Sequence, residues 1–290
     1  MRPRVLHVKP FHARCSCEAH GRRACDDAHV LIVLSPAKRL DVESKLTTRK
    51  RTEPRLLEHT AELIEVMRTK SADEVAGLMD LSPELAELNV KRYADLEAVP
   101  SPPGARPAIL TFAGDVAQGM DPWSFTERDL TEAQKTVRVL SGLYGLLRPL
   151  DLVQPYRLEM GTRLETDRGR SLYDFWGTTI TDLLAEDLEA SPGPGVLVDL
   201  ASEEYFKAVR PDRLDAPVVA PRFLDQAPNG DWRVISFLAK WARGAMAGWI
   251  VRNRIRSSRA LQDFDVAGYR YDKSRSTAAQ PTFTRTKADR

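Results

Sequence analysis

The chain has few sulfur and imidazole ligands beyond its first thirty residues. All three cysteines precede residue 30, and only His59 of the five histidines lies after it. Thiolate and imidazole nitrogens are the usual zinc ligands, so Cys15, Cys17 and Cys25 could form a metal site with nearby histidines. Their spacing fits no zinc module well. We therefore predict no metal site and no cofactor.

Long apolar runs are also missing. No stretch approaches the roughly 18 consecutive apolar residues that span a bilayer, and the first thirty residues lack the apolar run of a signal peptide. Apolar residues make up 42% and charged residues 29%, as in folded soluble proteins. We expect a cytoplasmic protein with no membrane contact.

Two common nucleotide-binding patterns are absent as well. The sequence has neither Gly-x-Gly-x-x-Gly nor Gly-x-x-x-x-Gly-Lys, so a standard Rossmann or P-loop site is not expected. Net charge is equally uninformative about nucleic acid. Six Lys or Arg and three Asp or Glu lie in the first 29 residues, and without them the net charge changes from +2 to −1.

Composition divides the chain into three parts. Residues 1–29 mix Arg, His, Cys and Gly without periodicity, and we interpret them as a non-native or disordered extension. Residues 30–272 are expected to form a single domain. Residues 273–290 are polar and are expected to form a flexible tail.

Within the domain, short apolar runs alternate with amphipathic segments. We predict buried strands at 30–34, 108–113 and 196–200, and further strands at 218–224, 232–237 and 268–271. We predict helices at 56–70, after the caps Ser71 and Ser82, and at 126–140, 171–189 and 237–256. This order indicates an α/β fold, with α+β as the alternative: a mixed, mostly buried central sheet flanked by helices, with a helical insert.

Polar side chains follow several predicted strands. Lys38 follows the first and Asp115 the second, while Ser202, Glu204 and Lys207 follow the strand at 196–200, and Lys240 and Arg243 follow 232–237. Ligands of α/β sheets bind beyond the carboxyl ends of the strands, so these residues converge if the strands are neighbours. The alternative is that each is an ordinary loop residue.

The segment 140–161 is dense in unusual residues. Gly142 and Gly145 bracket a turn where backbone could approach a phosphate, as in a helix-hairpin-helix element, although Pro149 would cut the second helix short. In an extended segment, Arg157 and Glu159 would point away from Tyr156, Leu158 and Met160. The two charged residues would form either a structural salt bridge or a ligand clamp.

Residues 232–262 hold seven Lys or Arg and no acid. Lys240, Arg243 and Arg254 lie near one helical face, and Phe237, Trp241, Ala245 and Trp249 suggest a buried opposite face. Such a helix could neutralise phosphates, or its cations could pair with acids elsewhere. The candidate nucleic-acid-binding residues are Gly142, Gly145, Lys240, Arg243, Arg252, Arg254 and Arg256.

Several motifs, in this order, make the chain resemble the YaaA peroxide stress-response family. They are Ser35-Pro-Ala-Lys38, Gly114-Asp-Val116, Leu140 to Gly161, Leu172 to Gly177, Leu200-Ala-Ser202 with Glu204 to Lys207, and Ile235 to Gly244. Members usually begin at the first strand, and Ala117 stands where an aromatic residue is expected. The resemblance implies survival of peroxide stress through lower availability of intracellular iron, with DNA binding through a helix-hairpin-helix element. Since thiolate and imidazole ligands are scarce, we expect any effect on iron to be indirect, unless Asp115, Glu159 and Glu204 form an oxygen-rich site.

Two functions follow from these observations. The first is a stress-protective, sequence-independent DNA-binding protein. The second is an enzyme acting on a small anionic, nucleotide-like molecule: Lys38, Arg157 and Arg243 would hold the anion, Asp115 or Glu159 would act as general base, and Tyr144 would donate a proton. A protein-interaction role without catalysis is a third reading.

Overall fold

The computed structural model describes residues 29–190, 193 and 195–289. Apart from His29, the predicted N-terminal extension lies outside this range. Helices and mixed sheets alternate along the chain, which confirms the predicted α/β class.

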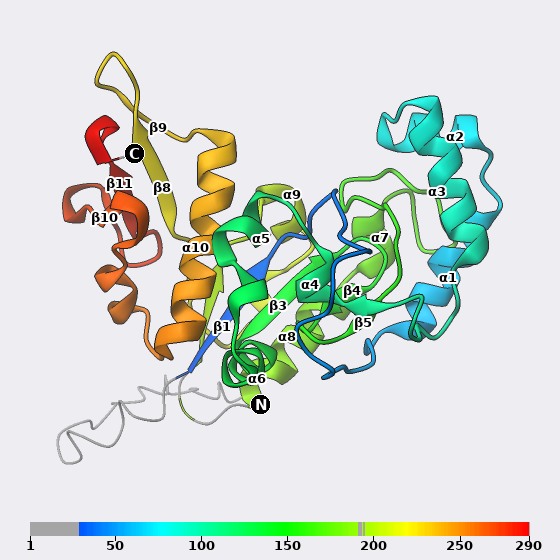
Figure 1. Ribbon diagram of the computed structural model, residues 1–290, viewed down its shortest axis with the longest axis horizontal. Coiled ribbons are helices and arrows are strands. Elements are labelled where there is room, and N and C mark those ends of the chain that lie inside the picture. The colour runs from blue at the N-terminus through cyan, green and yellow to red at the C-terminus, as the bar shows by residue number, and fades with distance from the viewer. Residues whose placement is uncertain (1–28, 191–192, 194, 290) are drawn as a thin grey trace, which may run out of the picture.

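A five-stranded sheet lies at the centre of the molecule, in the order β4-β3-β1-β6-β7 (Figure 1). Its strands are β1 His29–Leu34, β3 Val137–Ser141, β4 Gly145–Leu147, β6 Gly195–Asp199 and β7 Val218–Val219. β3, β1, β6 and β7 are parallel, and only β4 is antiparallel. The buried strands predicted at 30–34 and 196–200 are confirmed, and both run to the same edge of the sheet.

A helical insert follows β1 and lies at one end of the molecule (Figure 1). It comprises α1 Leu57–Arg68, α2 Ala72–Met79 and α3 Pro83–Asp95. Ser71 and Glu74 form the predicted capping box, and the Ser82 hydroxyl accepts from the Leu85 N–H ahead of proline at the first helical position. The sequence therefore located this insert correctly.

The strand predicted at 108–113 is wrong. A two-residue strand, β2 Arg106–Pro107, pairs with β5 Leu152–Val153, and the short helix α4 Ala108–Thr111 follows it. The α4 side chains are fully buried, and periodicity cannot distinguish a buried strand from a buried helical turn. The Thr111 hydroxyl donates to the Pro107 carbonyl and closes the turn.

Two predicted helices are shorter than expected. Helix α6 Glu127–Thr136 ends where β3 begins, because Val137 to Ser141 are buried on both faces. The helix predicted at 171–189 is two helices, α7 Leu172–Trp176 and α8 Thr179–Glu189. Gly177 separates them with a φ of +51°, a conformation that favours glycine.

Helix α10 Ser236–Asn253 packs closely on α5 Asp115–Met120 and also contacts α6. Gly119 and Gly244 permit this approach: a Cβ on either would lie within 2 Å of a backbone oxygen of the facing helix. The same packing holds Asp115 and the first half of α10 next to each other. The remaining helical elements are α9 Glu203–Phe206 and the 3-10 turns Pro122–Ser124, Pro211–Arg213, Arg259–Asp263, Val266–Gly268, Lys273–Arg275 and Lys287–Asp289.

A second sheet, in the order β10-β11-β8-β9, contacts α10 through β8. Its strands are β8 Arg222–Gln226, β9 Trp232–Arg233, β10 Arg270–Tyr271 and β11 Thr282–Arg285. The strand predicted at 218–224 is therefore divided between the two sheets. The prediction of a flexible tail from residue 273 is also wrong. Strand β11 lies between β10 and β8 in this sheet, and its Phe283 is fully buried.

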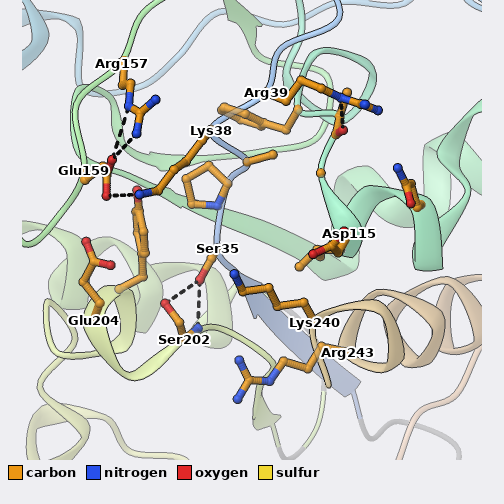
Figure 2. Close-up of a pocket in the computed structure, with 18 of the residues that line it drawn as sticks. Ser35, Lys38, Arg39, Asp115, Arg157, Glu159, Ser202, Glu204, Lys240 and Arg243 are labelled. Carbon is orange, nitrogen blue, oxygen red and sulfur yellow. Dashed lines mark hydrogen bonds and ion pairs between the residues drawn. The ribbon is translucent and has the colours of Figure 1, made fainter. Parts of the chain in front are cut away.

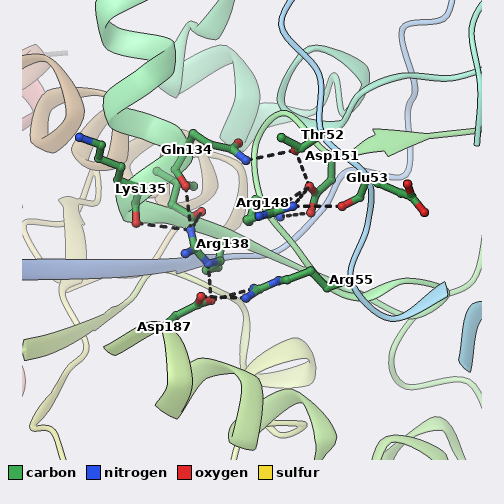
Figure 3. Close-up of polar contacts among 10 residues, drawn as sticks. Thr52, Glu53, Arg55, Gln134, Lys135, Arg138, Arg148, Asp151 and Asp187 are labelled. Atoms are coloured by element: carbon green, nitrogen blue, oxygen red, sulfur yellow. Dashed lines mark hydrogen bonds and ion pairs between the residues drawn. The ribbon is translucent and has the colours of Figure 1, made fainter. Parts of the chain in front are cut away.

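Buried ion pairs fix the segment before α1 to the central sheet (Figure 3). Asp187 on α8 accepts from Arg55 in a bidentate arrangement, at 2.8 Å for both bonds, and from Arg138 on β3 at 2.6 Å. Asp151 accepts from Arg148 and from the Thr52 hydroxyl. Charges with this little exposure stabilise a fold only when they are paired, so these groups act structurally.

Candidate functional site

A cavity of about 540 Å³ lies beyond the carboxyl ends of β1 and β6. Its lining brings together side chains from separate loops and helices (Figure 2): Ser35, Lys38, Arg39, Asp115, Arg157, Glu159, Ser202, Glu204, Lys240 and Arg243. The polar residues do meet in one cavity, but only β1 and β6 are neighbouring strands as the prediction required. Asp115 begins helix α5, and Lys240 and Arg243 lie on α10. Lys207 is the exception to this convergence, because its ammonium lies 5.0 Å from the Tyr173 ring centroid and does not line the cavity.

One wall of the cavity carries paired charges. The Lys38 ammonium lies 2.7 Å from one oxygen of Glu159, and the Arg157 guanidinium lies 2.9 Å from the other. Tyr156, Leu158 and Met160 are buried, as the alternation predicts, whereas Arg157 and Glu159 are only partly buried. The salt bridge is present, and it stands on the wall of the cavity.

At the floor of the cavity, two serines link the segments that follow β1 and β6. The Ser35 hydroxyl accepts from the Ser202 backbone N–H at 2.8 Å and donates to the Ser202 hydroxyl oxygen at 3.2 Å. Opposite the paired wall, Lys240 and Arg243 reach in from α10 (Figure 2). Within the described part of the chain, neither has a carboxylate oxygen within 4.0 Å.

Tyr144, the predicted proton donor, does not line this cavity. Its side chain is 1% exposed, and burial raises the pKa of its hydroxyl to about 12. The Gln154 backbone N–H donates to that hydroxyl at 3.3 Å. Tyr156 and Tyr205 line the cavity instead, and burial raises the pKa of both.

The turn between Gly142 and Gly145 joins strands, not helices. It links β3 to β4, so the helix-hairpin-helix interpretation of this turn is wrong. A Cβ on Gly142 would lie 2.3 Å from the Leu158 carbonyl oxygen, and the Trp176 indole N–H donates to the Gly142 carbonyl at 3.0 Å. Both glycines are buried, so close packing explains them. Helices α2 and α3, joined by residues 80–82, form a helical hairpin elsewhere in the chain.

The cations at the end of α10 are paired with other groups. Arg252 donates to the Ser124 hydroxyl and lies 3.5 Å from an Asp121 oxygen, while Arg254 and Arg256 form ion pairs with Asp129 and Glu132 on α6. For these three, the interpretation of cations paired with acids elsewhere agrees with the structure. Lys240 and Arg243 differ, because they face the cavity.

Phe237 was expected on the buried face of this helix, and that is wrong. Its side chain is 62% exposed, because the first turn of α10 extends beyond the packed region. Ala245 is buried, and Trp241 and Trp249 are partly buried against the core.

The sequence did not point to Arg39 and Tyr205, which line the cavity, or to Asp199, which lies outside its lining. Arg39 directly follows Lys38, and its guanidinium donates to the Ala113 carbonyl at 2.8 Å. Tyr205 lies one position after Glu204, within a motif already noted. Asp199 ends β6, and an acid that closes an apolar strand is the signal that could have identified it.

The Asp199 carboxyl has a raised pKa. Burial raises the pKa of its carboxyl to about 6, although the Ala201 backbone N–H and the charge of Arg243 act in the opposite direction. Burial likewise lowers the pKa of Arg243. At both groups, burial disfavours the charged form.

Asp199→Asn should stabilise the protein at neutral pH. Because the folded-state pKa is raised, ionised Asp199 costs stability above pH 6, and this cost disappears as the pH falls towards 3.8, the pKa of an unperturbed Asp carboxyl. We expect a gain of about 2 to 3 kcal/mol at pH 8 and little difference near pH 4, measured by urea unfolding. Asp167→Asn, at an exposed position, is the control and should have no effect at either pH. A loss of stability in Asp199→Asn at pH 8 would contradict this account.

Within residues 29–289, setting aside 191, 192 and 194, no group of three or more His, Cys, Asp or Glu could hold a metal ion. Asp115, Glu159 and Glu204 line one cavity without forming such a group. None of the described helices is both long and apolar enough to cross a membrane.

Fold and site together define an α/β protein with a cation-bearing polar pocket at the carboxyl edge of a parallel sheet. A family model described as "Peroxide stress protein YaaA" matches residues 30–275. The chain belongs to this peroxide stress protein family. The match ends before β11 but includes every residue named here as lining the pocket.

Proposed function

We propose that this peroxide stress protein binds a small anionic, nucleotide-like molecule in the pocket at the carboxyl edge of the central sheet. The observation that carries the proposal is the position of Lys240 and Arg243, two cations without a nearby carboxylate partner in the described chain, on a concave site. A volume of about 540 Å³ lies within the range of small-molecule sites. Asp115, on the same wall as Lys240, takes the role of general base if the bound molecule reacts (Figure 2).

DNA binding is the second candidate. It is supported by the exposure of Lys38, whose side chain is 65% exposed, and of Lys240 on the same pocket. Backbone phosphates could contact both without entering the cavity. Lower availability of intracellular iron, in the cytoplasm, remains the physiological outcome that we propose from the family resemblance.

Titration calorimetry with adenosine monophosphate and fluorescence anisotropy with duplex DNA, both on the full chain, test these alternatives. The two ligands would be compared at low and at raised salt, for the wild type and for Lys240→Gln/Arg243→Gln. Arg233→Gln/Lys273→Gln is the matched control, because it also removes two cations, from exposed positions outside the pocket.

If the pocket binds the small molecule, the nucleotide should bind with one-to-one stoichiometry and modest salt dependence. Binding should weaken in the pocket variant only. If DNA is the ligand, its affinity should fall by orders of magnitude with added salt, and the control variant should weaken it as well. Failure of the nucleotide to bind at low salt would rule out the first proposal.

A further inference from the structure

The two ends of the pocket differ in how their charges are balanced. At one end, Glu159 lies between Lys38 and Arg157, with contacts of 2.7 and 2.9 Å. Both carboxylate oxygens are thereby occupied. An incoming anion at this end would compete with a carboxylate that is already in place and only 20% exposed.

At the other end, where Asp115 also lines the pocket, the cations are not in contact with a carboxylate of the described residues. Lys240 and Arg243 have no carboxylate oxygen within 4.0 Å among the residues the structure describes. Asp199 affects Arg243 only through its charge, from outside the pocket lining. Arg243 is only partly exposed and lines the pocket, so an oxyanion would interact with its guanidinium more strongly there than in bulk water. Burial also lowers the pKa of Arg243.

The serine pair supplies an oriented donor at this same end. The Ser202 oxygen accepts from the Ser35 hydroxyl, so the Ser202 proton does not point back at Ser35. It remains available for a ligand oxygen inside the pocket. The Ser202 backbone N–H is already satisfied by Ser35, which fixes the geometry of the pair.

We propose that the pocket holds a phosphate group of its ligand between Ser202, Lys240 and Arg243, and not against Lys38 and Arg157. This inference rests on the proposed small-molecule function and adds an orientation to it. The phosphate lies at the α10 end, and the remainder of the ligand extends towards Glu159, where charges balance. A hydroxyl, a guanidinium and an ammonium provide hydrogen bonds and charge that suit a phosphate dianion.

Matched charge removals at the two ends test the orientation. Calorimetric binding of inorganic pyrophosphate and of adenosine monophosphate would be compared for the wild type, Lys240→Gln/Arg243→Gln and Lys38→Gln/Arg157→Gln. Each double variant loses two positive charges, so the long-range electrostatic attraction of the protein for an anion falls by a similar amount in both. Lys240→Gln alone is the variant least prone to misfolding, because this side chain is exposed.

We expect at least about 30-fold weaker binding when the α10 end is altered, and less than about 3-fold weaker binding when the Lys38 end is altered. Lys240→Gln alone should weaken binding by about 5- to 10-fold. The reverse order, with nucleotide binding retained in the wild type, would overturn the orientation and leave the small-molecule function standing. Absence of binding of both probes to the wild type would overturn both.

Discussion

Gly244→Ala should severely destabilise the protein. A Cβ at this position would lie 1.8 Å from the Val116 carbonyl oxygen and 2.7 Å from the Val116 carbonyl carbon. These atoms belong to the backbone of α5, so a rotamer change cannot relieve the contact, and the two helices must separate. We expect a loss of at least about 3 kcal/mol in the free energy of unfolding, measured with urea.

The function of the pocket should be affected in the same variant. Separation of α5 from α10 moves Asp115 away from Lys240, because the two residues reach the cavity from these helices. Adenosine monophosphate binding should therefore weaken even where the protein still folds.

Gly77→Ala is the matched control. Gly77 lies in the second half of α2, and a Cβ there meets no atom within 4 Å. Alanine is the better helix former, so this change should stabilise the protein by about 0.5 to 1 kcal/mol. Equal effects of the two substitutions would show that helix propensity, and not the approach of α5 to α10, determines the outcome at Gly244.

Local signals were sufficient to predict some elements. The apolar run of β1 and the serine caps of α2 and α3 specify their structures within a few residues, whatever the rest of the chain does. The convergence of Lys38 and Ser202 followed from a general property of parallel sheets, that carboxyl ends share an edge. Arg243 reaches the same cavity from α10, which no property of the sheet predicts.

Other features depend on contacts that sequence order does not reveal. Gly142 looked like a phosphate-binding turn because a glycine signals close approach, but the approaching group is the Leu158 backbone. Arg254 looked like a free cation because no acid lies near it in the sequence, but Asp129 lies 2.9 Å away on another helix. The order of residues along the chain does not show which partner a side chain contacts in the folded protein.

The end of the chain is the clearest such case, and it leads to the second large expected effect. A chain ending at Asp272 should fail to fold cooperatively. It would lack β11, which lies between β10 and β8, so both neighbouring strands would lose backbone hydrogen bonds. Phe283, fully buried and in contact with the Phe223 and Phe264 rings, would also be lost.

The truncation would remove a buried charge partner as well. The Arg285 guanidinium lies 2.8 Å from Asp225, which is fully buried. The Tyr269 hydroxyl donates to the other oxygen of this carboxylate at 2.7 Å. Removal of the guanidinium from a buried ion pair is strongly destabilising, because it takes away the charge that balances the carboxylate. We expect a combined loss above about 5 kcal/mol, comparable to the whole stability of many domains.

Circular dichroism during urea unfolding would measure this loss, with two further variants to locate its origin. A chain ending at Thr286 keeps β11 and should unfold much like the wild type. Phe283→Ala keeps the strand but removes the ring, and should lose about 3 to 5 kcal/mol. A chain ending at Asp272 that unfolds like the wild type would mean that residues 273–289 add no stability. In that case residues 273–289 would behave as their polar composition predicts, and the burial of Phe283 would not stabilise the fold.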